Sequence, residues 1–287
     1  MRDARGRPPP RPATANRKEG PAISTTSALS STTLPIPTPD GVADAFVARP
    51  DDGRRHPGVL LYGDAFGIRP ELEERARELA GHGYHVVVPH LYYRQGPAPV
   101  IDLPAHIGAE IRPAVVERLL PFLEEALVTE RIVRDAGAHL EFLTGRPETA
   151  PGSVGVVGYC IGGALALRAG TVYPDVVAAV AGFHPGFLVT DAPDSPHLGI
   201  PALAAEVHLG LSGNDMAPEA IATLEDAFSA AGVRSTVEIY PGTVHGFTMA
   251  DTDALHPAGS TGTASSPSSP ATCPPPPDAG PGSGRMG

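Results

Sequence analysis

Residues 153–170 read SVGVVGYCIGGALALRAG, and this stretch decides the fold. The first seven residues form a short apolar run typical of a buried β-strand. GGALALRAG, at 162–170, has the composition of a helix start. Cys160 lies between the two, with a glycine two residues away on each side. The stretch therefore predicts a strand, a tight turn at the cysteine, and a helix.

Three roles are open to Cys160. A free cysteine is often a small buried core residue, but such a residue needs no flanking glycines. A metal ligand needs a second Cys or His at ligand spacing, and none lies nearby. The third role is a nucleophile on a sharp strand-to-helix turn, where neighbouring side chains would collide and the helix N-terminus favours the thiolate. We interpret Cys160 as this nucleophile.

Strands and helices alternate over residues 41–242. Apart from 153–159, strands are predicted at 42–50 (an edge strand), 57–63, 84–89, 175–185, 205–213 and 234–242. Helices are predicted at 70–83, 109–127, 129–145, 162–170 and 218–232, with Pro113 and Pro121 dividing the second into two short pieces. This alternation is typical of an α/β domain with a doubly wound, mostly parallel sheet.

The two ends of the chain differ from this domain in composition. Residues 1–34 are rich in Pro, Ser, Thr and Arg, so we expect a disordered leader, with the domain at 35–256. Residues 257–287 are Pro-, Ser- and Gly-rich, so we expect a low-complexity disordered tail. A domain of this type needs a last helix after its final strand, and that helix is apparently missing. A frameshift near Leu255–His256 is one explanation.

Charge and hydropathy limit the partners. The chain has 21 basic and 32 acidic residues, a net charge of −11, which disfavours nucleic acid and anionic membrane surfaces. No apolar run reaches the roughly 18–20 residues that span a bilayer. With only two cysteines, Cys160 and Cys273, a disulfide framework is not expected. We expect a cytoplasmic monomer without a metal or other cofactor.

A thiol nucleophile needs a base, and the base needs an acid that orients it. Asp215 follows the strand predicted at 205–213, and His245 follows the strand predicted at 234–242. Taken singly, Asp215 fits a turn or helix cap and His245 a surface loop. Together they follow the chain order nucleophile, acid, histidine and lie where sites of open α/β sheets assemble. We predict that Cys160, His245 and Asp215 act together.

The chain resembles the dienelactone hydrolase family over about residues 35–250. The resemblance rests on LLYGDAFGIRPELEERARELAGHGYHVVVPHLYYRQGPAP, VGVVGYCIGG, FHPG, the Asp215 loop and EIYPGTVHGF. It implies an α/β-hydrolase fold, with Cys160 as nucleophile, His245 as base and Asp215 as its partner. Asp64 stands where the family has a glutamate that activates the thiol.

The resemblance also implies how the substrate is held. The backbone N–H groups of Ala65 and Ile161 are expected to form the oxyanion hole. Arg94 matches one of two arginines that hold the family's anionic lactone, and Met249 replaces the other. His184 is a further candidate for the substrate pocket.

We therefore expect a hydrolase that opens a small ester or lactone through an acyl-enzyme. A thioesterase or acyltransferase with the same three residues is the alternative among enzymes. An inactive, truncated α/β-hydrolase-like protein is the alternative from another class.

Overall fold

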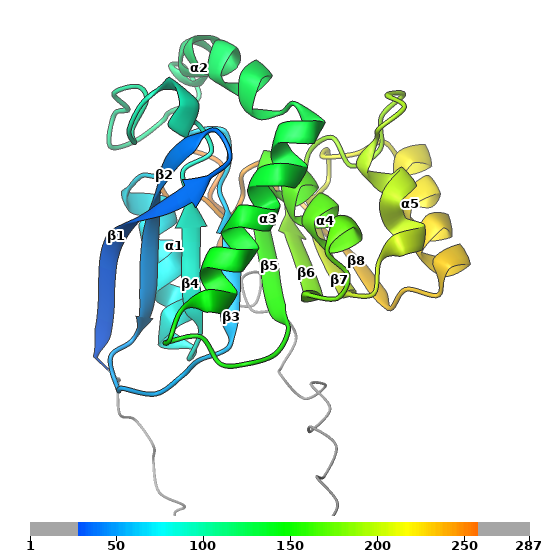
Figure 1. Ribbon diagram of the computed structural model, residues 1–287. Helices are drawn as coiled ribbons and strands as arrows, with labels where there is room; N and C mark the ends of the chain where they lie inside the picture. The colour runs from blue at the N-terminus through cyan, green and yellow to red at the C-terminus, as the bar shows by residue number, and fades with distance from the viewer. Residues whose placement is uncertain (1–27, 258–287) are drawn as a thin grey trace, which may run out of the picture.

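A computed structural model describes residues 28–257 of the chain. Its centre is an eight-stranded sheet in the order β1-β2-β4-β3-β5-β6-β7-β8 (Figure 1). The strands are β1 (Leu29–Thr38), β2 (Gly41–Pro50), β3 (Gly58–Tyr62), β4 (His85–Pro89), β5 (Val154–Tyr159), β6 (Val177–Phe183), β7 (Glu206–Ser212) and β8 (Ser235–Tyr240).

The sheet is mostly parallel and winds in two directions from its middle. β4, β3, β5, β6, β7 and β8 run parallel to their neighbours, whereas β1 and β2 form an antiparallel hairpin that joins the sheet at β4. The chain first places β4 on one side of β3, and it then adds β5, β6, β7 and β8 in turn on the other side of β3. The strand order thus reverses between β3 and β5, where ligands of open α/β sheets bind. The predicted α/β class and the mostly parallel sheet are confirmed.

Helices cover both faces. They are α1 (Pro70–Gly81), α2 (Arg112–Ala126), α3 (Thr129–Gly145), α4 (Ile161–Val172) and α5 (Pro218–Ala231), with short 3-10 turns η1 (Tyr93–Gln95) and η2 (Pro196–Ala202). α1 packs on one face through an apolar cluster with β2, β3 and β4. α3, α4 and α5 pack on the other and lie in front in Figure 1.

α2 lies apart from the other helices, at the top of Figure 1. Its buried residues Val115, Leu119 and Leu123 are four residues apart and form one stripe. This stripe packs against Ile161 and other residues of a third apolar cluster, which Cys160 also contacts. α2 therefore covers the end of the sheet where β5 meets α4.

The sequence expectation for the N-terminal edge of the domain is wrong. The disordered leader was expected to reach residue 34, but β1 begins at Leu29, and β1, not β2, is the edge strand. A ten-residue antiparallel ladder with β2 holds this polar strand, and Ile36 is its buried anchor. Prolines in the interior of a strand, such as Pro35 and Pro37, are typical of edge strands.

α2 is also one helix rather than two pieces. It begins at Arg112, and Pro121 lies inside it. A proline inside a helix loses a backbone hydrogen bond. The buried stripe on either side of Pro121 compensates for this loss, so the helix continues to Ala126.

From Pro241 to His256 the described chain forms turns and bends. The tail expected at 257–287, the missing last helix and most of the expected leader concern residues outside 28–257. Within the described part, no helix is long and apolar enough to cross a bilayer.

Candidate active site

The turn at Cys160 has strained backbone geometry. Cys160 follows β5 directly and precedes α4, with φ 55° and ψ −119°. Such a positive φ costs a residue other than glycine about 1–3 kcal/mol. A Cβ at Gly158 would lie 1.9 Å from the carbonyl oxygen of Gly162, and one at Gly162 would lie 2.5 Å from that of Tyr62. Both glycines are therefore required for the turn.

Cys160, His245 and Asp215 form a continuous hydrogen-bonded row. His245 Nε2 lies 3.1 Å from Cys160 Sγ, and His245 Nδ1 lies 2.7 Å from Asp215 Oδ1. The Asp215 side chain is fully buried, and its other oxygen accepts a hydrogen bond from the backbone N–H of Ser212. The structure thus brings together three residues that the sequence separates by up to 85 positions.

The row favours a charged imidazole. Burial opposes protonation of His245, but the hydrogen bonds to Asp215 and Cys160 outweigh it and raise its pKa to about 10. Burial also acts against the charged form of Asp215, yet the hydrogen bond from His245 lowers the pKa of that carboxyl. At neutral pH His245 is therefore an imidazolium that lies between the Asp215 carboxylate and the sulfur of Cys160.

His184 lies beneath His245 and is fully buried. The two rings meet edge to face, 5.1 Å apart, and His184 Nε2 lies 2.8 Å from Thr248 Oγ1. Burial, and then the neighbouring charge of His245, lower its pKa to about 3. His184 was a candidate for the substrate pocket; in the structure it is neutral, packs against His245 and has no exposed surface.

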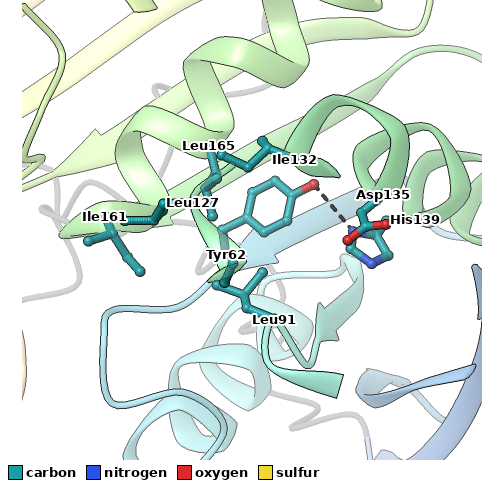
Figure 2. Close-up of a pocket in the computed structure, with 9 residues that line it drawn as sticks. Tyr62, Leu91, Leu127, Ile132, Asp135, His139, Ile161 and Leu165 are labelled. Atoms are coloured by element: carbon teal, nitrogen blue, oxygen red, sulfur yellow. Dashed lines mark hydrogen bonds between the residues drawn. The ribbon is translucent and has the colours of Figure 1, made fainter. Parts of the chain in front are cut away.

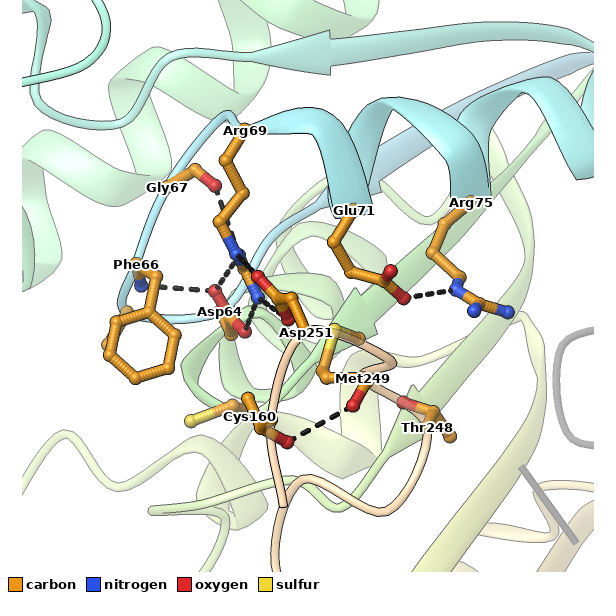
Figure 3. Close-up of polar contacts among 12 residues, drawn as sticks. Asp64, Phe66, Gly67, Arg69, Glu71, Arg75, Cys160, Thr248, Met249 and Asp251 are labelled. Carbon is orange, nitrogen blue, oxygen red and sulfur yellow. Dashed lines mark hydrogen bonds and ion pairs between the residues drawn. The ribbon is translucent and has the colours of Figure 1, made fainter. Parts of the chain in front are cut away.

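Asp64 is held by Arg69. Two guanidinium nitrogens of Arg69 lie 2.7 and 2.9 Å from the two oxygens of Asp64, and the same guanidinium donates to Asp251 at 2.5 and 3.1 Å (Figure 3). The backbone N–H of Phe66 also donates to Asp64. The family resemblance implies that Asp64 activates the thiol, but in the structure its carboxylate pairs with Arg69. Arg69 and Asp251 were not predicted.

The backbone N–H groups expected to form the oxyanion hole belong to Ala65, in the loop after β3, and to Ile161, the residue after Cys160. Within residues 28–257, no acceptor meets the N–H of Ala65 or of Ile161. The carbonyl of Ala65 accepts a hydrogen bond of 2.7 Å from Tyr92, and Arg69 lies over the ring of Phe66. Both contacts fix the loop after β3. Two backbone donors without an acceptor are what an oxyanion hole requires.

Arg94 does not join this group. Its guanidinium pairs with Asp40 at 2.8 Å and Asp135 at 2.9 Å, and it lies 4.5 Å from the centre of the Tyr93 ring. Asp40 follows β1 and Asp135 is on α3, so two carboxylates already neutralise Arg94. The structure therefore differs from the expectation that Arg94 holds a substrate anion. Met249, at the position of the family's other arginine, is buried.

A small cavity lies behind the elbow, between Ile161 and His139 (Figure 2). Its volume is about 20 Å³, the space of one water molecule rather than of a substrate. Tyr62 Oη and His139 Nδ1 are 3.4 Å apart beside it, and burial lowers the pKa of His139 to about 4. A more open hollow of about 220 Å³ also borders Ile161, and Leu165 and Phe187 are among its lining residues.

Comparison with known proteins agrees with this geometry. The sequence model of the dienelactone hydrolase family matches residues 43–266. The chain belongs to the dienelactone hydrolase family. It is a carboxylic ester hydrolase with the α/β-hydrolase fold. Carboxymethylenebutenolidase 1 of Cupriavidus pinatubonensis is 33% identical over 175 residues, which are 60% of this chain and 68% of that protein.

Solved structures share the fold. A dienelactone hydrolase-like promiscuous phosphotriesterase from metagenomic libraries has a TM-score of 0.61 at 23% identity, covering 77% of this chain and 85% of that one. An esterase of Pyrobaculum calidifontis has a TM-score of 0.56 at 18% identity, covering 82% and 83%. No cluster of side chains suited to a metal ion occurs among the residues that the structure describes.

Proposed function

We propose that this protein hydrolyses a small ester or lactone, with Cys160 as nucleophile, His245 as acid and base, and Asp215 as the residue that orients His245. The observation that carries the proposal is the row from Asp215 Oδ1 through His245 to Cys160 Sγ, with contacts of 2.7 and 3.1 Å. In such a row the imidazole takes the proton of the thiol, which becomes the more nucleophilic thiolate. The imidazole can then donate that proton to the leaving group.

In the first half of the reaction, the thiolate of Cys160 attacks the ester carbonyl carbon. The carbonyl electron pair moves to oxygen, where the N–H groups of Ala65 and Ile161 stabilise the negative charge. When the tetrahedral intermediate collapses, the bond to the leaving oxygen breaks, and that oxygen takes the proton from His245 Nε2. The products are an alcohol and a thioester on Cys160.

In the second half, His245 is neutral and accepts a proton from a water molecule at Nε2 as that water attacks the thioester. The intermediate expels the Cys160 thiolate and releases a carboxylic acid. His245 is again an imidazolium beside a thiolate. Asp215 stabilises that imidazolium in each half and remains ionised throughout.

In this proposal Asp64 supports the chemistry by holding the loop that carries Ala65. Its carboxylate accepts hydrogen bonds from Arg69 and from the N–H of Phe66, the residue after Ala65. Both oxygens are thus engaged. We assign to Asp64 the role of fixing the Ala65 N–H toward the oxyanion, in place of a role as proton acceptor for the thiol.

The experiment is hydrolysis of 4-nitrophenyl acetate with the full chain, with intact mass measured during turnover. Cys160→Ala should abolish hydrolysis, and the wild-type protein should gain one acetyl group on Cys160. Cys273→Ala, which changes the other cysteine, is the matched control and should behave as wild type. Hydrolysis that survives Cys160→Ala would refute the nucleophile.

The same measurement separates the alternatives. If thioesters turn over and matched oxygen esters do not, the protein is a thioesterase. If the acetyl group passes to added alcohols rather than to water, it is an acyltransferase. No acetylation and no turnover of any substrate would favour an inactive protein.

A further inference from the structure

We propose that Arg112 binds a carboxylate on the leaving-group side of the substrate, in a groove between α2 and the loop that carries His245. This inference rests on the proposed function, because it names the substrate that the same site selects. It makes Arg112 the cation that selects anionic esters, a role that the sequence assigned to Arg94.

Arg112 stands out among the arginines that the structure describes. It is half-buried, and no carboxylate lies within ion-pair distance of its guanidinium. Arg55 and Arg118 also have no carboxylate partner, but both are exposed to water. A guanidinium that has lost part of its water without gaining a partner is costly. Such a group has a strong preference for an anion.

The guanidinium faces the His245 loop. A Cβ built on Gly246 would lie 3.7 and 3.8 Å from the two terminal nitrogens of Arg112. Gly246 follows His245 directly, and Val244, which precedes it, lines the same groove as Arg112. The cation therefore lies beside the backbone of Gly246, the residue after His245.

The groove is large enough for part of a small ester. Its volume is about 650 Å³, and it is open to solvent. Its lining is mostly apolar and comes from the loop before α2, from α2 itself and from the His245 loop: Ile107, Ala109, Arg112, Pro113, Val116, Glu117, Leu120, Val244, Asp253 and Ala254. Ile107 and Val116 also belong to the apolar cluster against which Cys160 packs, so the groove and the cysteine border the same cluster.

Two carboxylates share the groove with Arg112. Asp253 is already occupied, because His106 Nε2 lies 2.7 Å from one oxygen and the N–H of Ala109 donates to the other at 2.6 Å. Glu117 is exposed. Arg112 is the only arginine or lysine of the lining. A substrate carboxylate would therefore meet its cation at the Gly246 side of the groove.

The direction of proton transfer decides which part of the substrate enters. His245 Nε2 protonates the leaving oxygen, so the leaving group must lie on the His245 side of the sulfur. The groove begins at Val244, next to His245. We place the acyl side toward Ile161, the residue after Cys160, which borders a hollow of about 220 Å³. The geometry thus matches a carboxylate on the alcohol portion of an ester, or on the corresponding end of a lactone ring.

The test compares two esters that differ only in this charge, 4-(carboxymethyl)phenyl acetate and its methyl ester. The methylene group keeps the two phenol leaving groups nearly equal. Arg112→Gln should lower the ratio of kcat/KM for the charged over the neutral ester by about tenfold, since a charge-assisted hydrogen bond is lost. Arg112→Lys should keep most of the ratio. Arg118→Gln, an exposed and unpaired arginine on the same helix, is the matched control and should leave the ratio unchanged.

A binding measurement keeps the inference separate from the proposed catalysis. Calorimetry with 4-(carboxymethyl)phenol, the product of the charged ester, needs no turnover. Binding that is about tenfold weaker in Arg112→Gln and unchanged in Arg118→Gln supports the inference even if no ester is hydrolysed. An unchanged ratio of kcat/KM, or product binding that is equal in wild type and Arg112→Gln, would overturn it. Failure of Cys160→Ala to abolish hydrolysis would count against the proposed function alone.

Discussion

Asp64 and Asp251 share one guanidinium, although Arg69 and Asp251 are 182 residues apart in the chain. Asp64 precedes the expected oxyanion donor Ala65, and Asp251 lies on the loop that follows His245. The shared contact therefore ties the loop after β3 to the loop that follows His245. All three side chains are largely buried, so water screens the contact little.

Arg69→Met should destabilise the fold by about 3–5 kcal/mol, because it leaves two buried carboxylates without their cation. Urea unfolding measures this change. Arg77→Met removes a more exposed arginine of α1 that pairs with Glu73, and it should cost under about 1 kcal/mol. Equal effects of the two substitutions would contradict a structural role for Arg69.

The charge of His245 should persist to high pH. Its pKa is raised to about 10 in the folded protein, above the ordinary value of about 6.5. The stabilisation it provides is therefore complete below about pH 6.5 and is lost as the pH rises through about 10. The free energy of unfolding lost in His245→Gln should be larger at pH 6 than at pH 10. NMR of the imidazole should show a midpoint near 10, and a midpoint near 6.5 would exclude the ion pair with Cys160.

Asp215→Asn should lower that midpoint, because a neutral amide no longer stabilises the imidazolium. By the same reasoning kcat should fall by about 10²–10⁴, since the base loses its orientation and its charge partner. The control is Asp226→Asn, which replaces an acid of α5 outside the row of Cys160, His245 and Asp215. A kcat within twofold of wild type would assign the orienting role to another group.

Gly158→Ala should prevent the elbow from forming, because the new methyl group would lie 1.9 Å from a backbone oxygen. Gly155→Ala is on the same strand, and its methyl group would have an ordinary contact of 3.8 Å with Val59. We expect Gly158→Ala to unfold at a much lower temperature than wild type and Gly155→Ala to remain close to it. Circular dichroism on heating distinguishes the two.

The parts of the site that follow from local pattern could be predicted from the sequence. Cys160 is marked by its glycines, and Asp215 and His245 are marked by their places after buried strands. Arg69 could not be predicted, because its partner Asp251 is near only once the sheet has formed. Arg94 was misplaced for a similar reason: the sequence does not show that Asp40 and Asp135 converge on it. β1 was missed because its prolines and threonines resemble a disordered leader, and only pairing with β2 makes them a strand.

The proposed nucleophile, Cys160, is also a point of backbone strain. The backbone there adopts φ 55°, which glycine adopts at little cost and a side chain does not. The free energy of unfolding of Cys160→Gly should therefore be at least as large as that of Cys160→Ala. Elsewhere, glycine usually lowers this free energy by roughly 0.5–1 kcal/mol relative to alanine. Cys160 thus shares with His184 and Phe187 a positive φ that a residue with a side chain adopts only at a cost. The residue at position 160 that gives the most stable fold should thus differ from the residue that gives the most active esterase.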